Sequence, residues 1–283
     1  MYKIMSKRTL SPNVHEYDIL APRVAKKAKA GQFIILRVDE VGERIPLTIA
    51  DFDAEKGTIT IVFAEAGHST RKLAQLNAGD AVQDFVGPLG VPSHVEKFGT
   101  VVMVAGGVGV APIYPIAREM KNAGNKVVCI MGARNKDLIF WEERMREVCD
   151  EVLLTTDDGS YVRQGFVTDV LKEYIQNEGN PQLVVAIGPL PMMRAIAELT
   201  REYEIKTMVS LNSIMVDGTG MCGACRVTVG GETKFVCVDG PEFDGHKVDF
   251  AEQLMRSRKY KPEEQQAFTR GSCGCGGGGK CHG

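Results

Sequence analysis

The 283-residue sequence has no apolar run long enough for a membrane-spanning helix and no apolar run at its N-terminus, so we expect neither a membrane anchor nor a signal peptide. An excess of charge of one sign is also lacking, since 34 Lys and Arg oppose 36 Asp and Glu. Without a basic cluster, nothing indicates a nucleic-acid partner. Eight cysteines without a secretion signal favour metal binding or redox chemistry over disulfides, and a cytoplasmic location.

Three of the cysteines follow an aspartate at a spacing that suits a metal cluster. The order is Asp217-x4-Cys222-x2-Cys225-x11-Cys237. Plant-type [2Fe–2S] sites use Cys-x4-Cys-x2-Cys and a distant fourth Cys, so only the first ligand differs here. Glycines between the ligands let the backbone wrap closely around a compact cluster. The pattern predicts a [2Fe–2S] cluster held by three thiolates and one carboxylate oxygen of Asp217.

Two other interpretations of these four residues remain open. One is a structural zinc ion, which three cysteines and a further ligand commonly bind. The other is that the cysteines are reduced and bind no metal. The asymmetric spacing favours iron–sulfur, because structural zinc sites pair their cysteines as Cys-x2-Cys knuckles. Cys237 is expected to close a short hairpin with strands at 226–229 and 234–237.

Residues 1–95 carry strand signals and little helix. Short β-rich segments separated by turns with Pro or Gly predict an antiparallel β-barrel, which closes its own sheet edges. The expected strands are 2–7, 15–20, 33–38 and 58–63, and one short helix is expected within 65–76.

Two stretches of this part carry residues that suit a binding site. Arg44-Ile-Pro-Leu-Thr48 is expected to leave a strand, and it places an arginine, a rigid proline and a hydroxyl in quick succession. Gly67-His-Ser-Thr70 opens the expected helix, whose free N–H groups and dipole suit a phosphate. Taken alone, each stretch is more often an ordinary strand end or helix cap.

In this order the two stretches resemble the flavin barrel of the ferredoxin reductase superfamily, in which an Arg-x-Tyr-Ser motif holds the flavin. Ala30-Gly-Gln-Phe33 and Gly87-Pro-Leu-Gly90 resemble two further segments of that superfamily. The arginine lies four residues before the hydroxyl instead of three, and leucine replaces the aromatic, so the resemblance implies FAD binding and leaves the role of the arginine open. The residues expected to bind FAD are Arg44, Pro46, Leu47, Thr48, Val62, Phe63, Gly67, His68, Ser69 and Thr70.

Residues 96–205 change to alternating strands and helices. An apolar run at 100–105 leads into Gly106-Gly-Val-Gly-Val-Ala-Pro112, an amphipathic segment at 113–121, and a second apolar run at 126–131. Strand, glycine turn, helix and strand form the βαβ unit of dinucleotide-binding domains, in which glycines let the pyrophosphate approach the backbone. Such a turn also occurs in α/β folds that bind no nucleotide.

Two later strand ends, at 153–159 and 183–189, strengthen the nucleotide interpretation, and the set resembles the nicotinamide domain of the same superfamily. Asp157 and Asp158 would repel the 2′-phosphate of NADP, whereas Arg134 would favour it, and we expect NAD(H). An ordinary turn is the alternative for the two aspartates. The residues expected to bind NAD are Gly106, Gly107, Gly109, Pro112, Arg134, Asp157, Asp158, Gly188, Pro189 and Met192.

The expected fold is therefore a multidomain β plus α/β chain. It comprises an N-terminal antiparallel FAD-binding β-barrel (1–95), a Rossmann-like NAD(H)-binding domain (96–205), a small [2Fe–2S] domain (206–250), and a C-terminal helix with a Gly/Cys-rich tail (251–283). A short charged helix is expected over 251–267, broken by Pro262. No function is assigned to the tail.

The three modules in this order resemble the electron-transfer subunits of dihydroorotate dehydrogenases, and more closely the small subunits of NADH-dependent reduced ferredoxin:NADP+ oxidoreductases, also known as sulfide dehydrogenases. The former have four cysteine ligands, whereas the latter are similar to this chain in using an aspartate. The resemblance implies a heterodimer whose larger subunit carries a second FAD and [4Fe–4S] clusters, binds NADP(H), and exchanges electrons with ferredoxin. It also implies hydride exchange between NAD(H) and FAD in this chain, single-electron transfer through its cluster, and electron bifurcation by the complex. No side-chain acid or base is expected to dominate.

Other functions remain open from the sequence alone. One is the electron-transfer subunit of a dihydroorotate-type dehydrogenase, which Asp217 disfavours. Another is a non-catalytic flavoprotein with a structural zinc. A stand-alone oxygenase reductase is disfavoured, because nothing resembles a separate plant-type ferredoxin domain.

Overall fold

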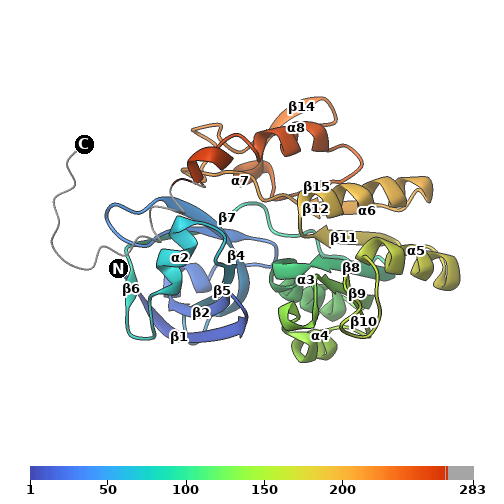
Figure 1. Cartoon of the computed structure of the whole chain (residues 1–283), viewed down its shortest axis with the longest axis horizontal. Coiled ribbons are helices and arrows are strands. Elements are labelled where there is room, and N and C mark those ends of the chain that lie inside the picture. Colours follow the sequence, from blue (N-terminus) through green and yellow to red (C-terminus); the bar gives the residue numbers. More distant parts are fainter. Residues whose placement is uncertain (265, 267–283) are drawn as a thin grey trace.

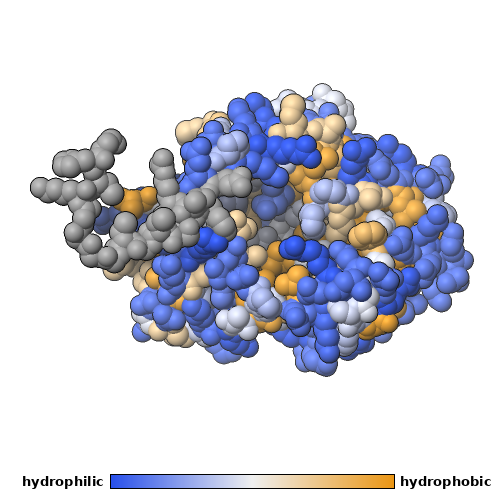
Figure 2. All heavy atoms as spheres, viewed as in Figure 1, coloured by the Kyte–Doolittle hydropathy of each residue, from blue (hydrophilic) through white to orange (hydrophobic). Residues whose placement is uncertain are grey.

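The structure is a computed structural model, and it describes residues 1–264 and residue 266. Figure 1 shows three parts: a barrel in blue and cyan, an α/β domain in green and yellow, and a C-terminal module in orange and red that lies above both. Hydrophilic residues cover most of the face seen in Figure 2. Among the described helices, none has both the length and the apolar character needed to cross a membrane.

The barrel is a seven-stranded antiparallel sheet in the order β6-β1-β2-β5-β4-β3-β7. Its two outer strands, β6 and β7, are joined by Gln83 alone, whose N–H donates to carbonyls at the end of β3. The sheet therefore curls onto itself, as predicted. Its elements are β1 (Tyr2–Ser11), β2 (Val14–Leu20), α1 (Pro22–Ala25), β3 (Phe33–Arg37), β4 (Arg44–Asp53), β5 (Thr58–Ala64), α2 (His68–Ala74), β6 (Ala81–Val82) and β7 (Asp84–Leu89).

Alternation along β3 separates the two faces of the barrel wall, because successive strand side chains point to opposite sides. Ile34 and Leu36 point inward and pack in the barrel core. Phe33 and Ile35 point outward and pack with apolar residues of the α/β domain and the C-terminal module. The outer face of this strand is thus buried against the rest of the chain.

The α/β domain has a six-stranded sheet in the order β10-β9-β8-β11-β12-β15. The first five strands are parallel, and their order, 3-2-1-4-5 in chain terms, is that of a Rossmann fold. The elements are β8 (Thr100–Gly106), the 3-10 turn η1 (Gly107–Gly109), α3 (Val110–Asn122), β9 (Lys126–Ala133), the 3-10 turn η2 (Lys136–Leu138), α4 (Glu142–Val148), β10 (Glu151–Thr156), α5 (Val167–Glu178), β11 (Leu183–Ile187), α6 (Leu190–Glu202) and β12 (Thr207–Ser210).

Helices cover both faces of this sheet, which is why its strands read as continuous apolar runs. Met103 of β8 packs with residues of α3 and α4, whereas its neighbours Val102 and Val104 pack with residues of α5 and α6. Residues 206–250, assigned from the sequence to a separate cluster domain, contribute two strands here: β12, and β15 (Glu242–Asp244), which pairs antiparallel with β12. The domain boundaries stay a prediction.

The C-terminal module contains the expected hairpin, β13 (Arg226–Val229) and β14 (Glu232–Phe235). The prediction that its second strand reaches Cys237 is wrong, because this residue lies in α7 (Val236–Asp239), where the Phe235 N–H donates to Asp239 Oδ2 at 2.6 Å and favours a helical turn. Helix α8 (Phe250–Arg256) is shorter than the expected 251–267; residues 257–260 form turns and 261–264 are helical again. Positions 265 and 267 of that range, and the Gly/Cys-rich tail, lie outside the described residues.

Candidate functional site

The segment expected to hold the flavin begins strand β4 instead of leaving one. Phe33 of β3 lies opposite Thr48, and Ile35 opposite Pro46. Because paired residues share a face, Arg44, Pro46 and Thr48 point out of the barrel, and we call these three the Arg44–Thr48 row. The first half of β4 pairs with β3 and only its second half pairs with β5, so proline is tolerated here.

Other expected FAD residues have different surroundings. The Phe63 side chain lies in the barrel core, edge-on to Tyr17 with ring centroids 5.1 Å apart, and Leu47 packs against the same core. Val62 faces outward and packs with residues of α3. A contact of Phe63 with flavin would therefore have to involve its backbone.

Helix α2 begins at the expected turn. Thr70 Oγ1 accepts the N–H groups of Ala66 and Gly67 at 2.9 and 3.0 Å, so this hydroxyl caps its own helix. Ser69 Oγ donates to Glu43 at 2.8 Å, which ties the helix to the residue before β4. The structure thus brings the two stretches expected to bind flavin side by side, with His68 exposed next to them.

The glycine turns expected to bind the dinucleotide meet at the carboxyl ends of β8 and β11. A Cβ on Gly109 would lie 2.1 Å from the Ile187 carbonyl oxygen, and one on Gly106 would lie 2.4 Å from Met192 Sδ. Only glycine fits at position 109, where the obstacle is backbone, whereas at position 106 a larger residue would have to displace the Met192 side chain. The chain then leaves β8 into α3 on one face of the sheet and β11 into α6 on the other. This is the switch point where open α/β sheets bind nucleotides.

Further residues at this edge were missed from the sequence. A pocket at the ends of β8 and β9 is lined partly by 138–140, an apolar stretch without a motif. The amide oxygen of Asn135 is buried and has no hydrogen-bond partner in the part of the chain that the structure describes. Such an atom is the kind of acceptor that a bound hydroxyl satisfies. In the sequence, the only indication of a role for Asn135 is its place shortly after the expected strand at 126–131.

The residues expected to choose between NAD and NADP lie together at the ends of β9 and β10. The Asp157 and Asp158 N–H groups donate to the carbonyls of Ala133 and Arg134 at 3.0 and 3.2 Å. Hydrogen bonds from the Ser160 side chain and N–H hold the pKa of Asp158 below its ordinary value. Asp158 therefore shapes a turn and stays ionised. A role in the turn is thus compatible with the negative charge that would repel the 2′-phosphate of NADP.

The cluster loop, residues 217–225, is organised by hydrogen bonds to Asp217. The Thr219 and Cys222 N–H groups donate to its two carboxylate oxygens at 2.9 and 3.0 Å. These bonds, with that of Thr219 the largest cause, lower the pKa of Asp217. Gly218, at a φ of +77°, is one of three glycines whose left-handed conformation lets the loop coil.

Two of the expected cluster ligands already meet. Cys225 Sγ and Cys237 Sγ are 3.3 Å apart and both side chains are buried, whereas Cys222 is exposed. Burial and the neighbouring Cys225 raise the pKa of Cys237 to about 12, so a thiolate here needs a metal ion to stabilise it. Within the described residues no three Cys, His, Asp or Glu side chains form a complete ligand group. The donor set suits iron–sulfur chemistry, and the individual ligands stay predictions.

The cluster loop packs directly on the barrel. A Cβ on Gly218 would lie 2.5 Å from Ile35 Cδ1 and 2.8 Å from Leu89 Cδ1. Since Ile35 lies opposite Pro46, only the width of one strand pair separates the loop from the Arg44–Thr48 row. Further along the barrel wall, Val62 belongs to one buried cluster with residues of α3, and its strand β5 contacts the η1 turn. The row therefore lies between the cluster loop and the domain that carries the nucleotide turn.

Two family models match the chain. The iron-sulfur cluster binding domain of dihydroorotate dehydrogenase B matches residues 212–249, a range that contains all four expected cluster ligands. The oxidoreductase NAD-binding domain matches residues 103–198, a range that contains every residue expected to bind NAD.

Two relatives cover nearly the whole chain. A Clostridium beijerinckii protein, described as an uncharacterized protein in the adh 3′ region, is 54% identical over 98% of this chain and 99% of its own length. A Thermotoga maritima protein, described as a dihydroorotate dehydrogenase B (NAD(+)), electron transfer subunit homolog, is 45% identical over 95% of this chain and 94% of its own length.

Two solved structures are similar to this chain. An NADH-dependent reduced ferredoxin-NADP oxidoreductase, solved for insight into flavin-based electron bifurcation, has a chain 44% identical to this one, with a TM-score of 0.90 over 95% of this chain and 97% of its own. Phthalate dioxygenase reductase is 16% identical, with a TM-score of 0.57 over 81% of this chain and 85% of its own, and shows the fold alone. Together the matches confirm the expected fold class and the three expected cofactors, FAD, a [2Fe–2S] cluster and NAD(H). They disfavour the zinc interpretation.

Proposed function

This chain belongs to the family of dihydroorotate dehydrogenase B electron-transfer subunits and their homologues, and from that premise we propose that it passes electrons between NAD(H) and a larger partner subunit. It is an oxidoreductase subunit of the iron–sulfur flavoprotein class. Bound FAD supplies the chemistry that splits a two-electron hydride into single electrons. The protein's task is to bind and orient its cofactors.

Each module has its own part in the proposed reaction. The turn at 106–109, with the Gly188–Met192 segment, holds the dinucleotide against glycine backbone. The Arg44–Thr48 row and the start of α2 hold the flavin. Asp217 and the three cysteines hold the cluster, and the buried pair Cys225 and Cys237 keeps two of the ligands away from water.

The spatial order of the modules carries this proposal. The Arg44–Thr48 row lies between the nucleotide domain, which contacts the barrel near Val62, and the cluster loop, which packs on Ile35. Electrons entering from a nucleotide and leaving through a cluster need the flavin at that middle position. An order with the cluster loop beside the nucleotide turn would not support the same route.

We further propose that the chain is the small subunit of a heterodimeric, electron-bifurcating NADH-dependent ferredoxin:NADP+ oxidoreductase. The larger subunit would bind NADP(H), carry a second FAD and [4Fe–4S] clusters, and exchange electrons with ferredoxin. The 44% identical chain from such an oxidoreductase and the aspartate at position 217 support this assignment. A dihydroorotate-type dehydrogenase is the second candidate, favoured by the family model over 212–249.

The experiment is anaerobic purification of the chain with its co-purifying partner, followed by determination of flavin, iron and acid-labile sulfide. We expect about one FAD, two iron and two sulfide on this chain, the last two being the content of a [2Fe–2S] cluster. Reduction of NADP+ by the complex that requires both NADH and reduced ferredoxin as electron donors supports the bifurcating assignment, and dihydroorotate oxidation supports the second candidate. Zinc without sulfide would contradict both.

A further inference from the structure

A cluster of charged and aromatic side chains joins the barrel to the α/β domain, away from the expected cofactor ligands. Its members come from both sides, with the carboxylates on the barrel and the guanidinium groups on the nucleotide domain. We call it the interdomain clamp, and it consists of Glu16, Asp51, Tyr114, Arg118, Trp141 and Arg144.

Asp51 is the centre of the clamp. Its Oδ1 accepts from Arg118 Nη1 and its Oδ2 from Arg144 Nη2, both at 2.8 Å. The aspartate side chain is only 20% exposed, so these charge-assisted bonds are partly shielded from water. Burial alone would lower the pKa of Arg118, yet the hydrogen bond and charge of Asp51 leave that pKa raised. Both arginines thus bind one carboxylate across the domain boundary.

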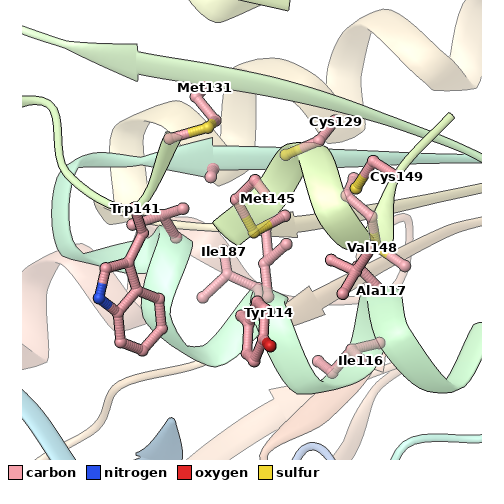
Figure 3. Close-up of a cluster of buried hydrophobic side chains, with 14 of the residues drawn as sticks. Tyr114, Ile116, Ala117, Cys129, Met131, Trp141, Met145, Val148, Cys149 and Ile187 are labelled. Carbon is pink, nitrogen blue, oxygen red and sulfur yellow. The ribbon is translucent and has the colours of Figure 1, made fainter. Parts of the chain in front are cut away.

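Aromatic rings hold the second arginine in place. Arg144 Cζ lies 4.1 Å from the Trp141 ring centroid and 4.3 Å from that of Tyr114. The planar guanidinium suits this stacking, which limits the directions in which Arg144 can reach Asp51. Figure 3 shows Trp141 and Tyr114 among the side chains of the buried cluster of this domain, which also contains Ile187, whose carbonyl meets Gly109 of the nucleotide turn.

The tryptophan is itself fixed from the barrel side. Trp141 Nε1 donates at 2.9 Å to Glu16 Oε2, and the Glu16 side chain is 1% exposed and also bonded to Arg8. Trp141 has a φ of +61°, a left-handed conformation that is strained for a bulky residue and persists only where its surroundings hold it. The clamp supplies such surroundings.

The clamp connects the two elements that carry the expected flavin and nucleotide contacts. Asp51 lies on β4, one strand with the Arg44–Thr48 row. Arg118 lies on α3, the helix that starts directly after the turn at 107–109. Because a strand and a helix are stiff, fixing Asp51 to Arg118 fixes the row relative to the turn.

We propose that Asp51 and Glu16 are positioning residues, which set the approach of the nicotinamide to the flavin by clamping α3 and α4 of the nucleotide domain onto the barrel. The inference rests on the proposed function for its catalytic consequence. Neither carboxylate is assigned a contact with a cofactor.

The first test is single-turnover reduction of the flavin by NADH, under anaerobic conditions, in full-length cofactor-loaded Asp51→Asn. We expect unchanged FAD and iron content and a reduction rate about tenfold to a hundredfold lower, because small misplacements of reacting groups have effects of this size. The KM for NADH should change much less, since the nucleotide turn is intact. A normal rate with only a lower thermal midpoint would overturn the proposal.

The second readout needs no turnover, because Trp141 is the only tryptophan of the chain. Iodide should quench its fluorescence more strongly in Asp51→Asn than in the wild type. High salt should produce part of the same change in the wild type, since it screens partly exposed ion pairs. Equal quenching in the wild type and the variant would overturn the clamp.

Arg146→Gln is the matched control, because Arg146 is also on α4 but pairs with Glu142 of the same helix at 2.8 Å. It should leave the rate and the quenching unchanged. Adding Arg118→Gln to Asp51→Asn should slow the reaction little further, since partners in one pair are not additive, and full additivity would contradict the assignment. If NADH does not reduce the wild-type flavin, the proposed function fails, and Trp141 quenching alone then decides for or against the clamp.

Discussion

Asp217 organises the cluster loop even before it is considered as a ligand, because both of its oxygens accept backbone N–H groups of that loop. A thiolate is a softer ligand than a carboxylate and would retune the cluster. We therefore expect Asp217→Cys to keep a cluster but to shift its reduction potential and the electron flux. A redox titration followed by electron paramagnetic resonance checks this. An unchanged potential would refute the ligand role of Asp217.

Gly218 is the residue at which the cluster loop touches the barrel. Gly218→Ala would place a methyl group 2.5 Å from Ile35 Cδ1, in a backbone conformation that is already unfavourable for alanine. Overpacking of this kind lowers the free energy of unfolding by about 1–3 kcal/mol. We expect a lower thermal midpoint and a lower iron content than in the wild type.

Gly231→Ala is the control for Gly218→Ala, because it separates the backbone strain from the contact with Ile35. Gly231 has a similar φ of +82°, but a Cβ there would meet nothing within 4 Å. Its substitution should lower the thermal midpoint only by the effect of backbone strain and should leave the iron content unchanged. Equal effects of the two substitutions would mean that the contact with Ile35 does not matter.

Some functional residues can be identified from the sequence and others cannot. The cysteine spacing is a local pattern and could be interpreted directly. Asp51 could not be identified as a clamp residue, because its partners Arg118 and Arg144 lie 67 and 93 positions away and no motif announces them. Phe63 was expected to bind flavin, yet its strand turns the side chain into the barrel core, which alternation decides only once the register is known.

At the scale of elements, β15 ties the C-terminal module to the rest of the chain. Glu242 of β15 accepts a hydrogen bond from Ser93 Oγ, in the linker that follows the barrel. Burial raises the pKa of Glu242 above its ordinary value of 4.5. Its contribution to stability is therefore complete below pH 4.5 and is lost as the pH rises through the raised value.

We expect Glu242→Gln, which resembles the protonated form, to raise the thermal midpoint by a few degrees at neutral pH and to have little effect near pH 4.5. Thermal midpoints of the wild type and the variant, measured from pH 4.5 to neutral pH, test the sign of this effect. Glu178→Gln, at an exposed position at the end of α5, is the control. A variant that is less stable than the wild type at neutral pH would contradict the expectation.

The elements also differ in how far the sequence could predict them. The runs at 100–105 and 126–131 are long apolar segments next to a glycine turn, and they formed β8 and β9 as expected. The short strands β12 and β15 carry little pattern, and the cluster loop and the hairpin lie between them in the chain. Their pairing depends on tertiary contacts, so the edge of the nucleotide sheet could not be predicted.

At the scale of the whole molecule, the outer face of the barrel carries an entry side and an exit side at different strands. The nucleotide domain packs near Val62 and the cluster loop packs on Ile35, with the Arg44–Thr48 row between them. Loss of the cluster should therefore leave the entry side intact. Cys222 is the best of the predicted ligands to substitute, because it is exposed and its replacement disturbs packing least.

We expect anaerobic NADH to reduce the flavin of the wild-type chain first and its cluster second. In Cys222→Ser the first phase should keep its rate within about threefold, because the nucleotide domain, the clamp and the barrel are unchanged. The second phase should be lost or altered with the cluster. Flavin absorbance and electron paramagnetic resonance of the cluster follow the two phases separately. A flavin phase slowed together with the cluster phase would mean that the cluster loop also shapes the nucleotide side, and the separation of entry from exit would then be wrong.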